Sequence, residues 1–142
     1  MKISIENKEL VSIHNFVFGL TIKGKKSRGR SKFLKLIMRK IDELNEDRKE
    51  ILERYADKDD EGKPIKQSDG NYKFEDSDEN TRLANAELAE LNKEVAVIEY
   101  GEYVNNINEL EEFLSDYDGE MSGQDAQAFD TLLDAFENKE EK

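Results

Sequence analysis

The feature that most constrains the fold is a run of apolar residues at heptad spacing across residues 34–55. Intervals of three and four residues separate its positions, with a single polar interruption at Arg48. Such spacing predicts one long helix whose apolar side needs a partner. Additional apolar residues widen that side in the first half only, so we predict that the first half packs in the core and the second half forms one arm of a helical hairpin. The heptad positions are Leu34, Ile37, Ile41, Leu44, Ile51 and Tyr55.

The second arm is expected to begin at Ser77 or Asp78 and to carry an apolar stripe of Leu and Ala residues. Between the arms, the turn sequences Asp60–Gly62 and Asp69–Asn71 bracket two short segments with hairpin character. We therefore predict an antiparallel helical arm over residues of about 42–93, tipped by a β-hairpin over about 60–76.

Two short stretches read as strands. Lys2–Glu6 alternates polar and apolar residues, and Val95–Tyr100 is rich in β-branched residues. We expect them to pair in a small antiparallel or mixed sheet. Further helices are predicted over residues 8–18, 102–117 and 123–137, with Asn7 capping the first and Ser122 with Asp125 forming a capping box at the last. The predicted fold class is α+β, mostly helical, in a single domain over residues 1–142.

Composition excludes several kinds of site. The chain of 142 residues has no Cys and one His, so thiolate metal sites, thiol nucleophiles and multi-His sites within one subunit are ruled out. No apolar run approaches the roughly 20 residues that span a bilayer, and the first residues lack the apolar core of a signal peptide. We therefore expect a cytosolic protein with no membrane partner and no cofactor.

Motifs for catalysis and metal binding are incomplete. No Gly-rich phosphate loop or nucleophile elbow is present, and His14 is interpreted as a core or boundary residue of an apolar helix face. Residues 57–62 match the start of a calcium-binding EF-hand loop, but the match then fails, with Pro64 at position eight and Ser68 at position twelve, where a bidentate Glu is needed. We expect no enzyme activity and no metal site.

Charge is distributed unevenly along the chain. The net charge is −12, yet Lys23–Lys40 holds nine of the 22 basic residues and no acid. Residues 1–41 carry +9, residues 42–54 carry −3 and residues 55–142 carry −18, which sum to −12. The acidic body disfavours nucleic acid as a partner, whereas the local concentration of positive charge favours an anionic one.

The basic segment is the one candidate site. We expect a loop followed by a helix that Ser27 or Ser31 caps, which would combine cations with the positive end of the helix dipole and so favour a phosphate or carboxylate ligand. The alternative is that these cations neutralise acidic helices of the same chain or of a second subunit. The candidate anion-binding residues are Lys23, Lys25, Lys26, Arg28, Arg30 and Lys32.

The chain resembles a family of small siphophage proteins from Gram-positive hosts, grouped as a domain of unknown function. The resemblance covers nearly the whole chain and rests on five segments, namely MKISIENKELVSIHNFV, KGKKSRGRSKFLKL, DEGKPI with DGNYKF, LAELNKEVAVIEYGEY and GEMSGQDAQAFDTLLDAFE. It implies a phage origin and a small accessory protein, and it transfers no catalytic residue.

Together these features predict a non-enzymatic phage accessory protein that acts by binding in the host cytoplasm. Counter-defence is one such role, either by sequestering an anionic nucleotide-type ligand at the basic helix start or by blocking a nucleic-acid site on a host protein with an acidic face. The main alternative is a structural or assembly accessory of the phage tail or baseplate, and a small hydrolase is the third. Because thin helices with heptad stripes offer little to cover one another, we also expect a homo-oligomer.

Overall fold

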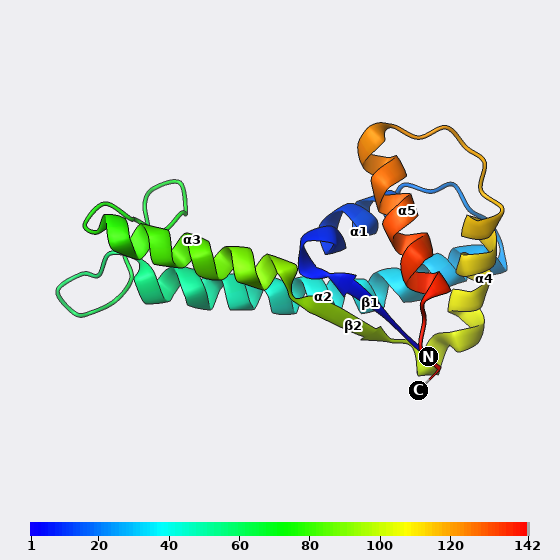
Figure 1. The fold of residues 1–142 in the computed structure, drawn as a ribbon, viewed down its shortest axis with the longest axis horizontal. Coiled ribbons are helices and arrows are strands. Elements are labelled where there is room, and N and C mark those ends of the chain that lie inside the picture. Colours follow the sequence, from blue (N-terminus) through cyan, green and yellow to red (C-terminus); the bar gives the residue numbers. More distant parts are fainter. Residues whose placement is uncertain (142) are drawn as a thin grey trace. The chain divides into compact units, whose positions relative to one another are not determined.

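The computed structural model describes residues 1–141 and confirms the predicted fold class (Figure 1). Helices dominate, and the only sheet in the described part of the chain has two antiparallel strands. The chain divides into two compact units. The first comprises Met1–Asp42 together with the chain from Val95 onward, and the second comprises Glu43–Glu94. Helix α2, Lys25–Tyr55, contributes to both units.

The first unit is built around the strands β1, Lys2–Glu6, and β2, Val95–Glu99. Their antiparallel pairing, with Ile3 opposite Ile98, confirms the predicted partnership of these two segments. The 3-10 turn η1, Asn7–Glu9, connects β1 to helix α1, Leu10–Phe18, and η2, Gly101–Tyr103, connects β2 to helix α4, Val104–Ser115. Helix α5, Gly123–Glu137, packs against β1, α1 and α4.

One apolar core joins these elements. It collects side chains from the inner face of the sheet and from one face of each helix, because alternation in strands and the 3.6-residue period in helices bring those residues to a common side. Exclusion of these side chains from water is the main stabilising contribution. The largest fully buried members are Tyr100, Phe33, Phe136, Ile3, Leu10, Ile13, Ile37, Ile98, Ile107, Leu110, Leu114 and Leu132.

In the second unit, the C-terminal part of α2 runs antiparallel to helix α3, Asp78–Lys93 (Figure 1). Arg48 donates a hydrogen bond to Asn92 at 3.0 Å. Tyr55, about two turns further along α2, donates to Glu87 at 2.6 Å. The polar interruption at Arg48 is therefore explained by its polar partner on α3. Helix α3 begins at Asp78, one of the two predicted starts, and Ser77 caps it by accepting a hydrogen bond from the Asn80 amide at 3.1 Å.

The segment between these helices forms two tight loops. An isolated bridge closes each loop, Lys58 to Pro64 in the first and Lys66 to Tyr72 in the second. Each loop contains an aspartate whose side chain accepts backbone amides, as in the turns that Asp favours. Gly62 and Gly70 supply the positive φ angles, 80° and 87°, that the loops require. The two segments expected to form the hairpin are paired by the Lys66–Tyr72 bridge, with backbone hydrogen bonds from the Gln67 amide to the Asn71 carbonyl at 2.8 Å and from the Lys73 amide to the Ile65 carbonyl at 2.9 Å.

Several predicted helix ends differ from the structure. Helix α2 begins at Lys25, so Ser27 and Ser31 lie inside it instead of capping it. Asn7 begins a 3-10 turn and is not the N-cap residue, while Ser122 occupies the N-cap position of α5 without a side-chain cap hydrogen bond. The early start of α2 follows Gly24, whose φ of 68° turns the chain directly into the helix.

Candidate functional site

Five cations form a continuous row on one side of α2. They are separated by intervals of three, four, three and four residues, so they fall on one helix face. From its first to its last member the row covers fourteen residue steps, or about 21 Å at 1.5 Å per residue. We call this row the cationic stripe, and its members are Lys25, Arg28, Lys32, Lys35 and Arg39.

The opposite side of α2 is fixed by close packing on α4. Gly29 is buried, and a Cβ atom built there would lie 2.2 Å from the carbonyl oxygen of Asn106. Phe33 and Ile37 continue the same buried side into the core. Because these residues must face α4 and the core, the 3.6-residue period turns the cationic stripe toward solvent.

Two of the predicted ligands lie on the packed side and have partners within the chain. Lys26 forms an ion pair with Glu112 of α4, with Nζ 3.5 Å from the carboxylate. Arg30 donates a hydrogen bond to the carbonyl oxygen of Leu20, in the connection before α2. The Lys26 contact is of the kind that the alternative interpretation describes, a cation neutralising an acidic helix, whereas Arg30 satisfies a backbone carbonyl.

The other four predicted anion-binding residues differ in how far their side chains are exposed to solvent. Lys23 is exposed just before α2, and Lys25 and Arg28 are exposed in its first turns. Lys32 is half-buried, with its Nζ atom 5.0 Å from the centre of the Tyr103 ring, which is a cation–π contact. No ion pair within residues 1–141 engages Lys23, Lys25 or Arg28.

Sequence reasoning missed Lys35 and Arg39 as members of this surface. Both are exposed, and neither forms an ion pair with another described residue. The signal was present in the three-four spacing of the cations, but it can be read only if Lys25–Lys32 is helical. Treating that stretch as a loop separated the two halves of the stripe.

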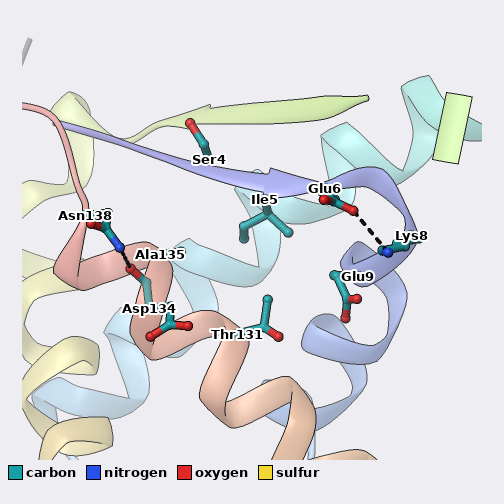
Figure 2. Close-up of a pocket in the computed structure, with 9 residues that line it drawn as sticks. All are labelled: Ser4, Ile5, Glu6, Lys8, Glu9, Thr131, Asp134, Ala135 and Asn138. Carbon is teal, nitrogen blue, oxygen red and sulfur yellow. Dashed lines mark hydrogen bonds and ion pairs between the residues drawn. The ribbon is translucent and has the colours of Figure 1, made fainter. Parts of the chain in front are cut away.

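Two cavities lie elsewhere in the first unit, and no stripe residue lines either of them. The larger, about 390 Å³, lies between β1 and α5 (Figure 2). Glu9 and Asp134 present carboxylates at its rim, whereas Glu6 is paired with Lys8 at 3.3 Å. The smaller, about 310 Å³, lies beside the end of α1 and the connection between α4 and α5.

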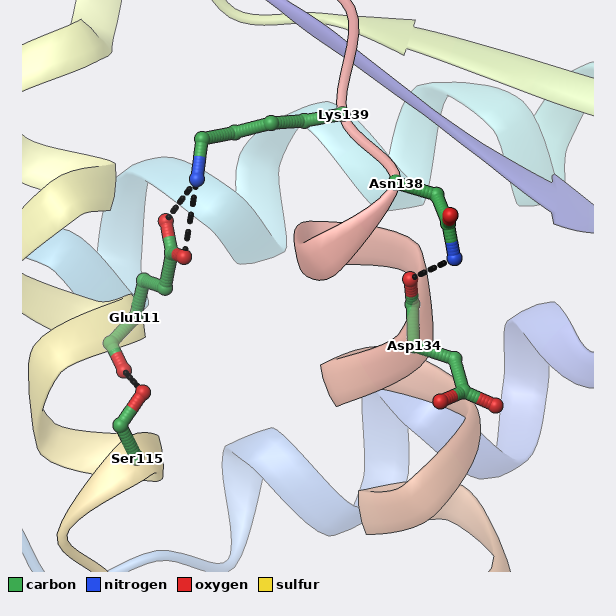
Figure 3. A network of polar contacts seen from close by, with 5 residues as sticks. All are labelled: Glu111, Ser115, Asp134, Asn138 and Lys139. Carbon is green, nitrogen blue, oxygen red and sulfur yellow. Dashed lines mark hydrogen bonds and ion pairs between the residues drawn. The ribbon is translucent and has the colours of Figure 1, made fainter.

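A polar network closes the chain near its C-terminal end (Figure 3). Lys139 contacts both carboxylate oxygens of Glu111 on α4, at 3.0 and 3.2 Å. Asn138 donates to the carbonyl oxygen of Asp134, which extends the last turn of α5. These contacts hold the end of the chain where Glu140 can pair with Lys2 of β1.

Tyr100 is the described residue whose buried side-chain polar atom has no hydrogen-bond partner. Its ring packs edge-on against Phe136 in the core. Burial raises the pKa of the Tyr100 hydroxyl above its ordinary value of 10.0, and the negative charge of Glu111 raises it further. A phenol held neutral in this way is a core residue and has no access to solvent for proton transfer.

The other two sequence candidates, His14 and Asp57, make contacts that belong to the fold. His14 is half-buried and stacks on Phe18, with ring centroids 6.1 Å apart. Asp57, the first residue of the incomplete EF-hand match, is buried and accepts hydrogen bonds from the amides of Glu75 and Asp76 at 2.8 and 3.2 Å. Across residues 1–141, no group of three or more His, Cys, Asp or Glu residues is placed to hold a metal ion.

Among the described residues, none of the helices is both long enough and apolar enough to cross a membrane. A family model described as "Protein of unknown function (DUF1617)" matches residues 1–142. Searches of curated proteins and of solved structures gave no match.

Proposed function

Since the chain belongs to the DUF1617 family of proteins of unknown function, we propose its role from its surface: it is a non-enzymatic binding protein whose cationic stripe engages an anionic partner. The observation that carries this proposal is the stripe itself. Four of its five cations are exposed and form no ion pair with another described residue, although the chain carries 34 acidic residues that could neutralise them. A surface that leaves such charges unpaired is suited to a partner of opposite charge.

The form of the stripe favours an extended partner. A row of about 21 Å on the outside of a helix can contact a complementary row of carboxylates or phosphates along its whole length. A nucleotide-sized ligand would contact only part of this row, whereas an extended partner can contact all five cations. We therefore favour an acidic surface on a host protein over a nucleotide signal.

The proposed setting follows from the family resemblance. We propose that the protein originates from a phage of Gram-positive bacteria and acts in the host cytoplasm, where occupying an acidic site on a host protein would serve counter-defence. The acidic body of the chain would repel nucleic acid and other polyanions away from the stripe, which would sharpen its choice of partner.

The test is a capture experiment from infected host lysate, followed by mass spectrometry. The triple variant Lys25→Glu, Arg28→Glu and Lys35→Glu should lose the captured partner, because it reverses three of the five charges of the stripe. Capture by the wild type should weaken as salt is raised, since exposed charges are screened. Retention of the same partner by the triple variant would contradict the proposal.

A matched control reverses three exposed lysines in the second unit, Lys49, Lys63 and Lys93. It makes the same change in net charge and should leave capture unchanged. Calorimetry with a cyclic dinucleotide and with a short oligonucleotide tests the nucleotide-type ligand separately. Binding of either probe, lost in the stripe variant, would move the proposal from a host protein to that ligand class.

A structural or assembly accessory of the phage tail or baseplate is the second candidate. It is favoured by apolar side chains that are exposed in the first unit, with Phe18 69% and Val11 47% exposed on α1. Quantitative mass spectrometry of purified virions decides between the roles. Stoichiometric amounts in the particle would support assembly, and absence from the particle would support action in the host cytoplasm.

A further inference from the structure

The two edges of the small sheet are treated differently by the fold. The outer edge of β1 is paired with the end of the chain, where the Lys2 amide donates to the Glu140 carbonyl at 2.8 Å and the Glu140 amide donates back at 2.9 Å. In Figure 1 the C-terminal segment accordingly meets the start of β1. No strand in the described part of the chain pairs with the outer edge of β2.

The alternation of hydrogen-bonded pairs between β1 and β2 shows which backbone groups of β2 point to its outer edge. The Tyr100 amide donates to the Met1 carbonyl at 2.9 Å, so these two opposed residues form a hydrogen-bonded pair. In an antiparallel ladder such pairs recur at every second residue. Ala96 and Ile98 therefore direct their amide and carbonyl groups toward β1. Lys2 agrees with this alternation, because its amide and carbonyl point away from β2 and bond to Glu140.

It follows that Val95, Val97 and Glu99 direct their backbone groups away from β1. None of these six amide and carbonyl groups forms a hydrogen bond to another of the residues 1–141. The flanking side chains are apolar and accessible, with Val95 56% and Val97 38% exposed. The β2 edge also lacks the lysine, proline or bulge that commonly protects an edge strand from pairing.

We propose that the outer edge of β2 pairs with the same edge of a second copy of this chain, antiparallel and centred on Val97. In this register Val97 lies opposite Val97 of the second copy, and Val95 lies opposite Glu99. All six outward groups of each strand then find partners. The sheets of both copies become continuous, and no carboxylate lies opposite another.

The register is specified by the length of the strand. Sliding the pair by one hydrogen-bonded position in either direction would place Glu99 opposite Lys93, or Val95 opposite Gly101. Lys93 belongs to helix α3 and Gly101 to the turn η2, so neither continues the strand. An identical five-residue edge is therefore the occupant that satisfies this edge completely.

A cysteine crosslink tests the pairing and its register, because the chain contains no cysteine. Hydrogen-bonded antiparallel pairs have Cα atoms and Cβ atoms each about 5.5 Å apart, which is wider than the Cβ separation of a disulfide but within reach of a short bifunctional thiol reagent. Val97→Cys should therefore form a covalent dimer when such a reagent is added. Val95→Cys should not, because its copies would be displaced by four residues, about 13 Å along the strand. Equal or slower crosslinking of Val97→Cys would overturn the proposal.

Sedimentation equilibrium over a concentration series provides the second measurement. The wild type should show a monomer–dimer equilibrium, and Val97→Lys should weaken it by roughly tenfold or more, because two ammonium groups would meet at the centre of the pair. Val11→Lys, at an exposed valine of α1, is the matched control and should dimerise as the wild type does. A wild type that stays monomeric, or that dimerises equally after Val97→Lys, would overturn the proposal.

Discussion

At the scale of single residues, Gly29 decides how the basic segment is oriented. Two opposing effects would follow from a methyl group at this position. Alanine is the better helix former by about 1 kcal/mol, but its Cβ would lie 2.2 Å from the Asn106 carbonyl oxygen, where only backbone could give way. The steric effect should win, because backbone of two packed helices must separate to relieve it.

We therefore expect Gly29→Ala to lower the free energy of unfolding by about 1–3 kcal/mol, the usual range for overpacking. Urea unfolding followed by circular dichroism measures it. Gly123→Ala is the control, since its added Cβ meets nothing within 4 Å, and it should leave the stability unchanged or slightly higher. A stabilised Gly29→Ala variant would show that α2 and α4 are not in this close contact.

Tyr100 is the second residue with a distinct expectation. Its buried hydroxyl lacks a partner, so Tyr100→Phe should leave the free energy of unfolding unchanged or raise it by up to about 1 kcal/mol. The pKa of the Tyr100 hydroxyl is raised in the folded protein. The stability associated with its buried, neutral form is therefore fully present below pH 10.0 and is lost as the pH rises through the pKa of the folded protein.

The phenylalanine variant should consequently withstand alkaline unfolding to a higher pH than the wild type, as measured by fluorescence or circular dichroism during a base titration. Tyr103→Phe serves as the comparison, because its half-buried ring contacts Lys32 through its face and would be retained. A loss of stability well above 1 kcal/mol in Tyr100→Phe would mean that the hydroxyl is hydrogen-bonded, for example to an ordered water.

At the scale of secondary-structure elements, α2 serves two purposes through its two faces. One face contributes Phe33, Leu36 and Ile37 to the core, and the other carries the cationic stripe. Both follow from a single helical phase, so a change that rotates the helix would disturb packing and surface charge together. This coupling explains how a strongly basic segment can also be a core element.

The contact between the chain end and α4 is an element-scale prediction. Replacing Lys139 with Met or Glu111 with Gln should each cost about 1 kcal/mol, and a double-mutant cycle should show coupling between them, because both side chains are about three-quarters buried, at 27% and 23% exposed. The same cycle on the exposed pair Lys63 and Glu61 should show coupling near zero. Equal coupling in the two cycles would contradict this ranking.

At the scale of the whole molecule, charge is the dominant property. Residues 95–142 contain 14 acidic and two basic residues, whereas residues 1–42 contain 11 basic and three acidic ones. These parts belong to the same unit, so their attraction favours its folding, while the net charge of −12 opposes compaction through self-repulsion.

We expect moderate salt to raise the melting temperature at pH 7, because screening relieves repulsion among the excess carboxylates more than it weakens the few partly buried pairs. Thermal unfolding at increasing sodium chloride concentrations measures this. Neutralising Asp116, Asp118 and Glu120, all exposed between α4 and α5, should raise the melting temperature at low salt and flatten its salt dependence. A melting temperature that falls steadily with salt would show that attractive pairs dominate.

Much of the fold could be predicted because it depends on local patterns. The two strands, their partnership and the residues 123–137 of α5 follow from alternation, helical period and turn residues. On α2, Phe33 and Leu36, two of the apolar residues that widen the predicted face, are buried, whereas the predicted heptad position Leu34 is only half-buried. Neighbouring apolar positions differ by 100° on a helix, so packing partners decide between them.

The set of elements and the location of positive charge can be read from the sequence, since periodicity and composition are properties of neighbouring residues. Which cations on α2 point outward depends on tertiary packing. Gly29 must meet α4, and that long-range contact turns Lys26 and Arg30 inward while aligning Lys25 and Arg28 with Lys35 and Arg39. Contacts between residues distant in sequence fix a helix's rotation, and no local pattern records them.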